Sequence, residues 1–509
     1  MARLPLSLAL IALATLLGAA APSREQQVAR LVARNANSPA ALRVLLQPMP
    51  KGGDLHNHLD GSVYAEDYLQ WASEDGDCID RATRTIMPPP CAADQMPAKD
   101  LVTRDPKFYQ EMIDALSMRN FVPGTGTGET NGHDHTFATF RRFGAVAAAH
   151  LGDMLAATLR IADADRVDYI EQITDPSQAF APELLNANPA FDPNDFDADA
   201  KTLAARLPAL VLAARAEYDA AEDKMHATLA CGTPNADTAC FVQAHYLFFV
   251  LRTLPPAQAF AQTALGFALA DADPRFVGVN LVAPEDDPVA LRDFELQMRM
   301  FGFFHARYPK VKLSLHAGEL SLGLVPPTEL GFHIRDTIEI AGASRIGHGY
   351  ELPYERDAAG LLKDMATRKI AVEVNLTSNA ITPGIVGTEH PLALFRAAHV
   401  PVTLAADDEG VFRIDLTHEY VRAVTEQKLG YLDLKEMARN GLEYSFLPGP
   451  SLWQGGNYRR IAKPCAHDTP GAAKPSPVCA NFLHSSEKGA LQWQFEGEIA
   501  AYETAVLAR

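Results

Sequence analysis

Short apolar runs alternate along the chain with longer segments whose apolar residues recur every three or four positions. The short runs are rich in Val, Ile and Leu, which is typical of strands buried on both faces of a parallel sheet. The longer segments, such as 289–308 and 358–368, have the spacing of amphipathic helices. Eight runs are predicted to be strands: one that opens the segment 52–62, and then 167–173, 245–252, 275–282, 311–319, 345–349, 370–378 and 400–408.

Eight strands that alternate with helices predict an α/β fold, a (β/α)8 TIM barrel with its helices outside the sheet. A helical stretch is expected before the first strand, at about 25–46. Three stretches break the alternation and carry Pro, Asp, Asn, Gly or an Ala-rich helix, near 75–105, 186–240 and 455–485. We expect these to be insertions or appended loops on one barrel domain, residues 22–509.

The first 21 residues have the pattern of a signal peptide. Arg3 precedes an apolar run at about 4–17, and small residues follow at 18–21. The run is short for a membrane span, and an uncleaved anchor is the alternative interpretation. No later segment has 18 uninterrupted apolar residues, so we expect an exported protein, periplasmic or extracellular, without a stable membrane span after cleavage.

Cysteine usage agrees with export, because disulfides persist in oxidising compartments. The six cysteines form three close pairs in loop-like segments, and no CxxC spacing favours the competing interpretation, a zinc site. Six cysteines allow fifteen pairings, so local pairing is a hypothesis. It predicts the disulfides Cys78–Cys91, Cys231–Cys240 and Cys465–Cys479.

The chain is acidic, with a formal net charge of -18 and no block of basic residues. An acidic surface repels phosphate backbones, so nucleic acid is an unfavourable partner. A small-molecule partner fits this charge better.

Polar side chains follow four of the predicted strands, at the edge where barrels carry their chemistry. Each set alone is weak, since an isolated His-x-His is more often a pair of surface histidines in a turn. Four sets at one edge are a stronger signal. They are His56 and His58 after the first strand, His316 and Glu319 after the fifth, His348 after the sixth, and Asp407 and Asp408 after the eighth.

Three imidazoles and one carboxylate, from His56, His58, His316 and Asp407, suit one zinc ion with a position left for water. Zinc would lower the pKa of that water to about 7. Glu319 lies three residues beyond a ligand and is predicted to be a general acid/base. His348 is predicted to orient or deprotonate the water, and Asp408 to bind substrate or position the nucleophile.

From about residue 48 to 450, ending in "NGLEYSFLPG", the chain resembles the adenosine deaminase family of the metal-dependent amidohydrolase superfamily. Its export signal and additional loops are more similar to the secreted, growth-factor-related branch. The resemblance implies the same four zinc ligands, a proton from Glu319 to purine N1, and a hydroxide held by His348. It also implies substrate contacts from His58, from Asp408 to the purine N7, and from Asp60 to the ribose 5′-hydroxyl.

Two departures from the family pattern are visible, together with one difference from binuclear amidohydrolases. Ala283 stands where the family has a Gly whose backbone N–H meets purine N3, so that backbone donor is expected at Ala283. The segment "YIEQITDP" lacks the Arg that the family usually carries. The fourth strand lacks the Lys that bridges two metals in binuclear relatives, which favours one metal per chain.

A second His-x-His, His133 and His135, has no third ligand nearby, so a lid over the barrel mouth is a better interpretation than a second metal site. Phe137, Phe140 and Phe143 have helical spacing and are predicted to be core or pocket wall. Polar residues near the seventh strand support the site or form a turn, namely Asn375, Ser378 and Asn379.

The motifs together predict a secreted, zinc-dependent hydrolytic deaminase that converts adenosine or 2′-deoxyadenosine to inosine and ammonia. One alternative is a deaminase of another aminopurine, such as adenine or a modified adenosine. The other is a non-catalytic, growth-factor-like binding protein that uses the barrel only as a scaffold.

Overall fold

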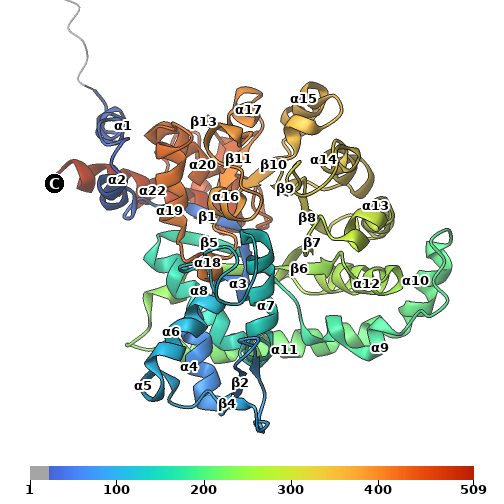
Figure 1. Cartoon of the computed structure of the whole chain (residues 1–509). Helices are drawn as coiled ribbons and strands as arrows, with labels where there is room; N and C mark the ends of the chain where they lie inside the picture. The colour runs from blue at the N-terminus through green and yellow to red at the C-terminus, as the bar shows by residue number, and fades with distance from the viewer. Residues whose placement is uncertain (1–21, 509) are drawn as a thin grey trace, which may run out of the picture.

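A computed structural model describes residues 22–508, so the predicted signal peptide lies outside the described residues. Eight parallel strands form one sheet whose neighbours follow chain order, with helices around it (Figure 1). The strands are β1 (Gly52–His58), β5 (Val167–Thr174), β6 (Gln243–Leu251), β7 (Phe276–Val282), β8 (Lys312–Ala317), β9 (Arg345–His348), β10 (Ala371–Val374) and β11 (Val402–Leu404).

The sheet is nearly closed between its first and last strands. Asn57 of β1 forms an isolated parallel bridge with Asp407, three residues beyond the end of β11. The Asp407 amide donates to the His56 carbonyl at 2.9 Å, and the His58 amide donates to the Asp407 carbonyl at 3.3 Å. The predicted (β/α)8 barrel is therefore confirmed.

Helices cover the outside of the strands. The layer consists mainly of α8 (Leu151–Ala164), α12 (Pro256–Ala272), α13 (Pro288–Arg307), α15 (Ala358–Arg368), α17 (Leu392–Ala397), α19 (Leu416–Thr425) and α20 (Tyr431–Glu443). Within residues 22–508, no single helix combines the length and hydropathy of a membrane span. Among these residues, one pair of helices, α7 (Gly132–Ala149) and α8, meets both criteria when taken together, but the pair is bent by 111°.

Three predicted elements differ from the structure. The stretch 25–46 is two helices, α1 (Arg24–Arg34) and α2 (Pro39–Leu46), because Ser38 caps the second helix and Pro39 suits only its first turn. The segment 370–378 is a strand only to Val374, and α16 (Leu376–Ile381) begins directly after it. Likewise, β11 ends at Leu404, so Asp407 and Asp408 lie in the following loop.

The three irregular stretches add small substructures to the barrel. Residues 75–105 contain an antiparallel sheet of β2 (Cys78–Asp80), β3 (Ile86–Met87) and β4 (Gln95–Pro97). Residues 186–240 contain α10 (Phe196–Ala204) and α11 (Leu207–Thr228), and α11 packs against α8 and α12. The last stretch contains a strand of the hairpin β12 (Trp453–Gln454) and β13 (Asn457–Ile461), and α21 (Pro477–His484).

All three predicted disulfides are present: Cys78–Cys91, Cys231–Cys240 and Cys465–Cys479. Each closes a short loop within one of the irregular stretches. The final helix, α22 (Glu487–Leu507), returns to pack against α1 and α20 (Figure 1).

A glycine pair sets how closely α20 approaches β1. A Cβ atom added to Gly441 would lie 2.4 Å from the Gly53 carbonyl oxygen, and one added to Gly53 would lie 2.8 Å from the Gly441 carbonyl oxygen. Real Cβ atoms do not approach backbone oxygens this closely, so the helix must move away if either glycine gains a side chain.

We therefore expect Gly441→Ala to lower the free energy of unfolding by about 1–3 kcal/mol, the usual cost of overpacking. The measurement is thermal unfolding followed by circular dichroism. Gly144→Ala is the matched control, because a Cβ atom at Gly144 on α7 meets nothing within 4 Å. Equal melting temperatures for the two variants would contradict the close approach.

Candidate active site

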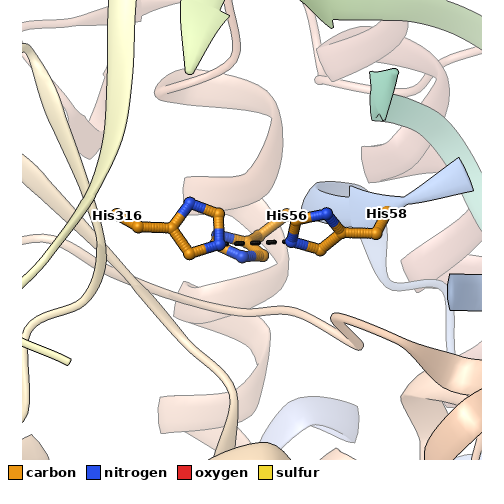
Figure 2. A group of neighbouring side chains, drawn as sticks. All are labelled: His56, His58 and His316. Carbon is orange, nitrogen blue, oxygen red and sulfur yellow. Dashed lines mark hydrogen bonds between the residues drawn. The ribbon is translucent and has the colours of Figure 1, made fainter. Parts of the chain in front are cut away.

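A pocket of about 420 Å³ opens at the carboxyl ends of the barrel strands. Figure 2 shows that the rings of His56, His58 and His316 point toward one another, although His316 belongs to β8 and the other two end β1. Their potential ligand atoms lie within 4.8 Å of one another, and His56, His348 and Asp407 form a second group of this kind. The structure thus brings together polar residues that are up to about 350 positions apart in sequence.

The four predicted ligands surround one small volume. The Nε2 atoms of His58 and His316 are 3.1 Å apart. Asp407 Oδ1 is 3.6 Å from His56 Nε2 and 3.4 Å from His58 Nε2. His56 Nε2 is buried and has no hydrogen-bond partner among the described residues, as expected for a nitrogen whose partner is a cation.

At His56, burial is outweighed by the facing carboxylates of Glu373 and Asp407, which raise the pKa of the ring. At the other two histidines, burial favours the neutral imidazole that metal binding requires. It lowers the pKa of His58 to about 3 and holds the pKa of His316 well below its ordinary value. Two neutral rings whose Nε2 atoms face each other can share only one proton, whereas a cation between them accepts both lone pairs. The donor set of three imidazoles and one carboxylate suits zinc.

Buried acceptors fix the orientation of two of these rings. Glu373 Oε2 is 2.9 Å from His56 Nδ1, and Asn280 Oδ1 is 2.8 Å from His316 Nδ1. An Nδ1–H donor on each ring leaves Nε2 unprotonated and directed to the centre of the site. Sequence analysis missed both residues, although a charged residue inside the strand "AVEV" and an Asn inside "VGVNLV" were visible signals.

Glu373 is itself held in place beneath the site. The Arg345 guanidinium lies 2.5 Å from Glu373 Oε1, and the Ser314 hydroxyl donates to the same oxygen at 2.7 Å. Arg345 also pairs with the buried carboxylate of Glu171. Nearby cations and hydrogen bonds outweigh burial, so the pKa of Glu373 is lowered and the side chain is an anion.

The predicted acid/base residues stand at the rim of the same cluster. His348 Nε2 lies 3.7 Å from Glu319 Oε1 and 3.8 Å from Asp407 Oδ2. Its other nitrogen, Nδ1, is 2.9 Å from Asn379 Oδ1. Burial raises the pKa of Glu319, which favours the protonated form that a general acid needs.

Asp408 and Asp60 complete the acidic wall of the pocket. Burial, together with the neighbouring Asp407, raises the pKa of Asp408 well above its ordinary value. Burial also raises the pKa of Asp60, to about 6. Ser378 supports the site as well, because its side chain hydrogen-bonds to Asp407. Against the effect of burial, the neighbouring histidines and this hydrogen bond lower the pKa of the Asp407 carboxyl group.

Three site residues hold a left-handed backbone, which ordinary residues adopt at a cost. They are Ala283 (φ 81°), His348 (φ 65°) and Asp407 (φ 63°). Ala283 lines the pocket at the end of β7, where the family resemblance implied a backbone donor. Such conformations at strand ends turn the chain sharply and aim the following side chains into the pocket.

The second His-x-His does not join the cluster. Within residues 22–508, neither His133 nor His135 belongs to any group of three or more potential metal ligands. His133 lies between Asp134 and Asp286, at 3.0 Å from each, and His135 Nδ1 lies 3.2 Å from Glu129 Oε2.

The aromatic residues of α7 divide between pocket and core. Phe137 and Phe140 line the pocket, so this helix forms one wall of it. Phe143 is buried and stacks on Tyr68 with ring centroids 4.6 Å apart.

Comparisons with known proteins agree with the fold and with the motifs. A model of the adenosine deaminase family matches residues 208–452. The adenosine deaminase of Clostridium perfringens is 31% identical over 142 residues, which are 28% of this chain and 40% of that protein. The adenosine deaminase of Yersinia pseudotuberculosis is 33% identical over 146 residues, again 40% of that protein. The chain thus spans about two fifths of the length of these relatives.

Two solved structures show the same fold. A zinc-bound amidohydrolase from Burkholderia ambifaria superposes with a TM-score of 0.52 at 16% identity, over 92% of this chain and 95% of that one. The N6-methyl-AMP deaminase of Arabidopsis thaliana superposes with a TM-score of 0.51 at 18% identity, over 80% of this chain and 94% of that one.

The eight-stranded parallel barrel carries a cluster of histidines and an aspartate at its strand ends, where a metal ion could be held. Over residues 208–452, the chain is similar to the adenosine deaminase family.

Because Glu373 fixes the His56 ring, we expect Glu373→Gln to weaken zinc binding about 10- to 100-fold, the usual effect of losing such a partner. The affinity is measured by competition with a chromophoric chelator. Glu389→Gln, an exposed residue, is the matched control. An unchanged zinc affinity in Glu373→Gln would show that Glu373 does not orient the ligand.

Proposed function

We propose that this protein is a zinc-dependent hydrolytic deaminase that converts adenosine or 2′-deoxyadenosine to inosine and ammonia. The observation that carries the proposal is the buried, unpartnered His56 Nε2, which faces Asp407 at the base of a pocket that also holds Glu319 and His348. The similarity to the adenosine deaminase family over residues 208–452 supports the reaction, and the size of the pocket, about 420 Å³, suits a small molecule.

One zinc ion per chain would be held by His56, His58, His316 and Asp407. Their donor atoms fit such an ion, because the facing imidazole nitrogens and the carboxylate converge without a proton donor of their own. When bound, zinc supplies Lewis acidity that makes water a nucleophile at neutral pH.

The remaining side chains supply protons and orientation. Glu319, whose pKa burial raises, would deliver a proton to purine N1 and so make C6 electrophilic. His348, held by Asn379, would orient the attacking water. Asp408 would contact that water and purine N7.

The substrate itself would be bound by the walls of the pocket. The Ala283 backbone N–H would donate to purine N3, and Asp60 would accept from the ribose 5′-hydroxyl. Phe137 and Phe140 on α7 provide apolar surface for a flat ring.

We also propose that the protein is exported to a periplasm or to the outside of the cell. The apolar run near the N-terminus and the three short-range disulfides support this. Fractionation of the producing cells, with mass spectrometry of the mature N-terminus, tests it.

Ultraviolet absorbance of the purified mature protein with adenosine, 2′-deoxyadenosine, adenine and AMP tests the reaction and the alternatives together. Turnover of the two nucleosides that a chelator abolishes, and that zinc restores, supports the proposal. Exclusive turnover of adenine would establish the aminopurine alternative, and no turnover by zinc-loaded protein would favour a binding protein.

Removing one ligand should remove both the metal and the activity. We expect His316→Ala to contain well under one zinc per chain and to lose turnover, because three ligands bind zinc more weakly than four. Elemental analysis measures the zinc, with His484→Ala, an exposed residue on α21, as the control. Full zinc occupancy in His316→Ala would refute the ligand assignment.

Replacing the proposed proton donor should stop the chemistry and leave binding in place. Glu319→Gln keeps the shape of the side chain but cannot transfer a proton, so we expect kcat to fall about 10⁴-fold or more. Zinc content and the affinity for ground-state nucleoside should remain near those of the parent.

The matched control for Glu319→Gln is Glu329→Gln, the same chemical change ten residues further along the segment after β8. Glu329 is not among the residues that line the pocket. If Glu319→Gln deaminates adenosine within tenfold of the parent, the acid is a different residue.

A further inference from the structure

A second chamber lies against the pocket. It has a volume of about 220 Å³, and it shares the lining residues Asp60, Phe180 and Phe249 with the pocket that holds the His/Asp cluster. Because a water molecule takes up about 30 Å³ in the liquid, the chamber has room for a substituent of several non-hydrogen atoms. None of the four predicted metal ligands lines it, so it extends away from the reacting centre.

The wall of the chamber is mainly apolar. Gly144 and Ala147 of α7 and Leu151 of α8 form one side, and Ile173 of β5 forms another. Glu217 comes from α11, within the irregular stretch 186–240. The chamber is therefore built partly by a segment that is added to the eight-stranded barrel.

The titratable groups of the chamber are all acidic. Asp60, Asp175 and Glu217 line it, and none of its described lining residues is a lysine or an arginine. Asp175 Oδ1 accepts the Phe249 amide at 3.0 Å, while its Oδ2 is buried and has no partner among the described residues. Glu217 accepts hydrogen bonds from the backbone and hydroxyl of Ser177.

This charge pattern selects between possible occupants. A phosphate would face three carboxylates without a cation, and desolvating an unpaired anion is costly. Arg141 lines only the first pocket and is exposed to solvent at its rim. A neutral group can pack against the apolar wall, and a hydroxyl or ammonium group can donate a hydrogen bond to the unpartnered Asp175 Oδ2.

We propose that this chamber binds the 5′-substituent of a nucleoside substrate, and that the substituent is neutral or positively charged and not a phosphate. The inference rests on the proposed function: with purine C6 at the His/Asp cluster, the sugar on N9 lies at the far end of the ring system. Its 5′ carbon is the point from which a substituent passes Asp60 into the chamber.

The test compares substrates that differ only at the 5′ position. We expect 5′-amino-5′-deoxyadenosine to give a kcat/KM value at least equal to that of adenosine. We expect 5′-deoxy-5′-methylthioadenosine, which fills the chamber but gives up the hydrogen bond to Asp60, to stay within about tenfold of adenosine. AMP should be at least 100-fold poorer. A higher kcat/KM for AMP than for adenosine would overturn the proposal.

A variant that fills the chamber makes the test specific. A Cβ atom at Gly144 meets nothing within 4 Å, so Gly144→Leu places its side chain in open space without displacing the backbone. We expect it to lower the ratio of kcat/KM for the methylthio nucleoside to kcat/KM for adenosine by at least tenfold. Gly144→Ala, which makes the same helix change with a small side chain, should alter that ratio less than twofold.

A second variant tests the role of Asp175. Asp175→Asn keeps the acceptor for the Phe249 amide but replaces Oδ2 by a donor. It should lower the ratio of kcat/KM for the amino nucleoside to kcat/KM for the methylthio nucleoside by at least fivefold. Equal effects on both substrates would show that Asp175 does not accept a hydrogen bond from the substituent.

Calorimetric binding of the same nucleosides separates failure of this inference from failure of the proposed function. If the parent deaminates none of them, the proposed reaction is wrong, and the binding affinities of the parent and Gly144→Leu still report on the chamber. If adenosine is deaminated but Gly144→Leu weakens binding of adenosine and the methylthio nucleoside equally, the reaction stands and the chamber is not a substituent site.

Discussion

Closure of the barrel between its first and last strands is the constraint on which the site depends. Two backbone hydrogen bonds join Asp407 to His56 and His58, and the same bonds place the Asp407 carboxylate 3.4–3.6 Å from the imidazole nitrogens. The pairing that closes the sheet and the pairing that assembles the proposed ligand set are thus one interaction. A barrel open at this seam would keep His316 and lose the geometry of the other three.

Beneath the seam, a buried ionic network ties the stability of the barrel to the orientation of the site. Arg345 pairs with Glu171 and Glu373, and Glu373 holds the His56 ring. Buried charges are costly unless each has a partner, so removing one member leaves the others uncompensated. Well-packed hydrophobic residues in place of such a network would often give the same or a higher free energy of unfolding. Its value here is that it leaves the His56 ring one orientation.

The parts that surround the barrel shape what reaches the site. The wall formed by α7 supplies Phe137 and Phe140 to the first pocket and Gly144 to the second chamber. The added helix α11 contributes Glu217 to the same chamber. Barrels of one family share the chemistry of their strand ends and differ in such segments, so the fold alone does not determine the substrate. In this chain, an added segment contributes one of the three acidic residues of the chamber, Glu217, while Asp60 and Asp175 follow the barrel strands β1 and β5.

The eight strands and the residue types at their ends could be predicted from the sequence, because apolar periodicity and strand-end chemistry are local properties of the chain. The three disulfides could be predicted only as one hypothesis among fifteen pairings, the one that the short cysteine separations favour. Strand lengths were overestimated at 370–378 and 400–408, where polar loop and helix residues follow buried strands directly. Only the tertiary structure decided that Glu373 and Asn280 orient the rings, that His348 and Asp407 adopt left-handed backbone, and that a second chamber adjoins the pocket. These features arise from contacts between residues far apart along the chain, which no local pattern encodes.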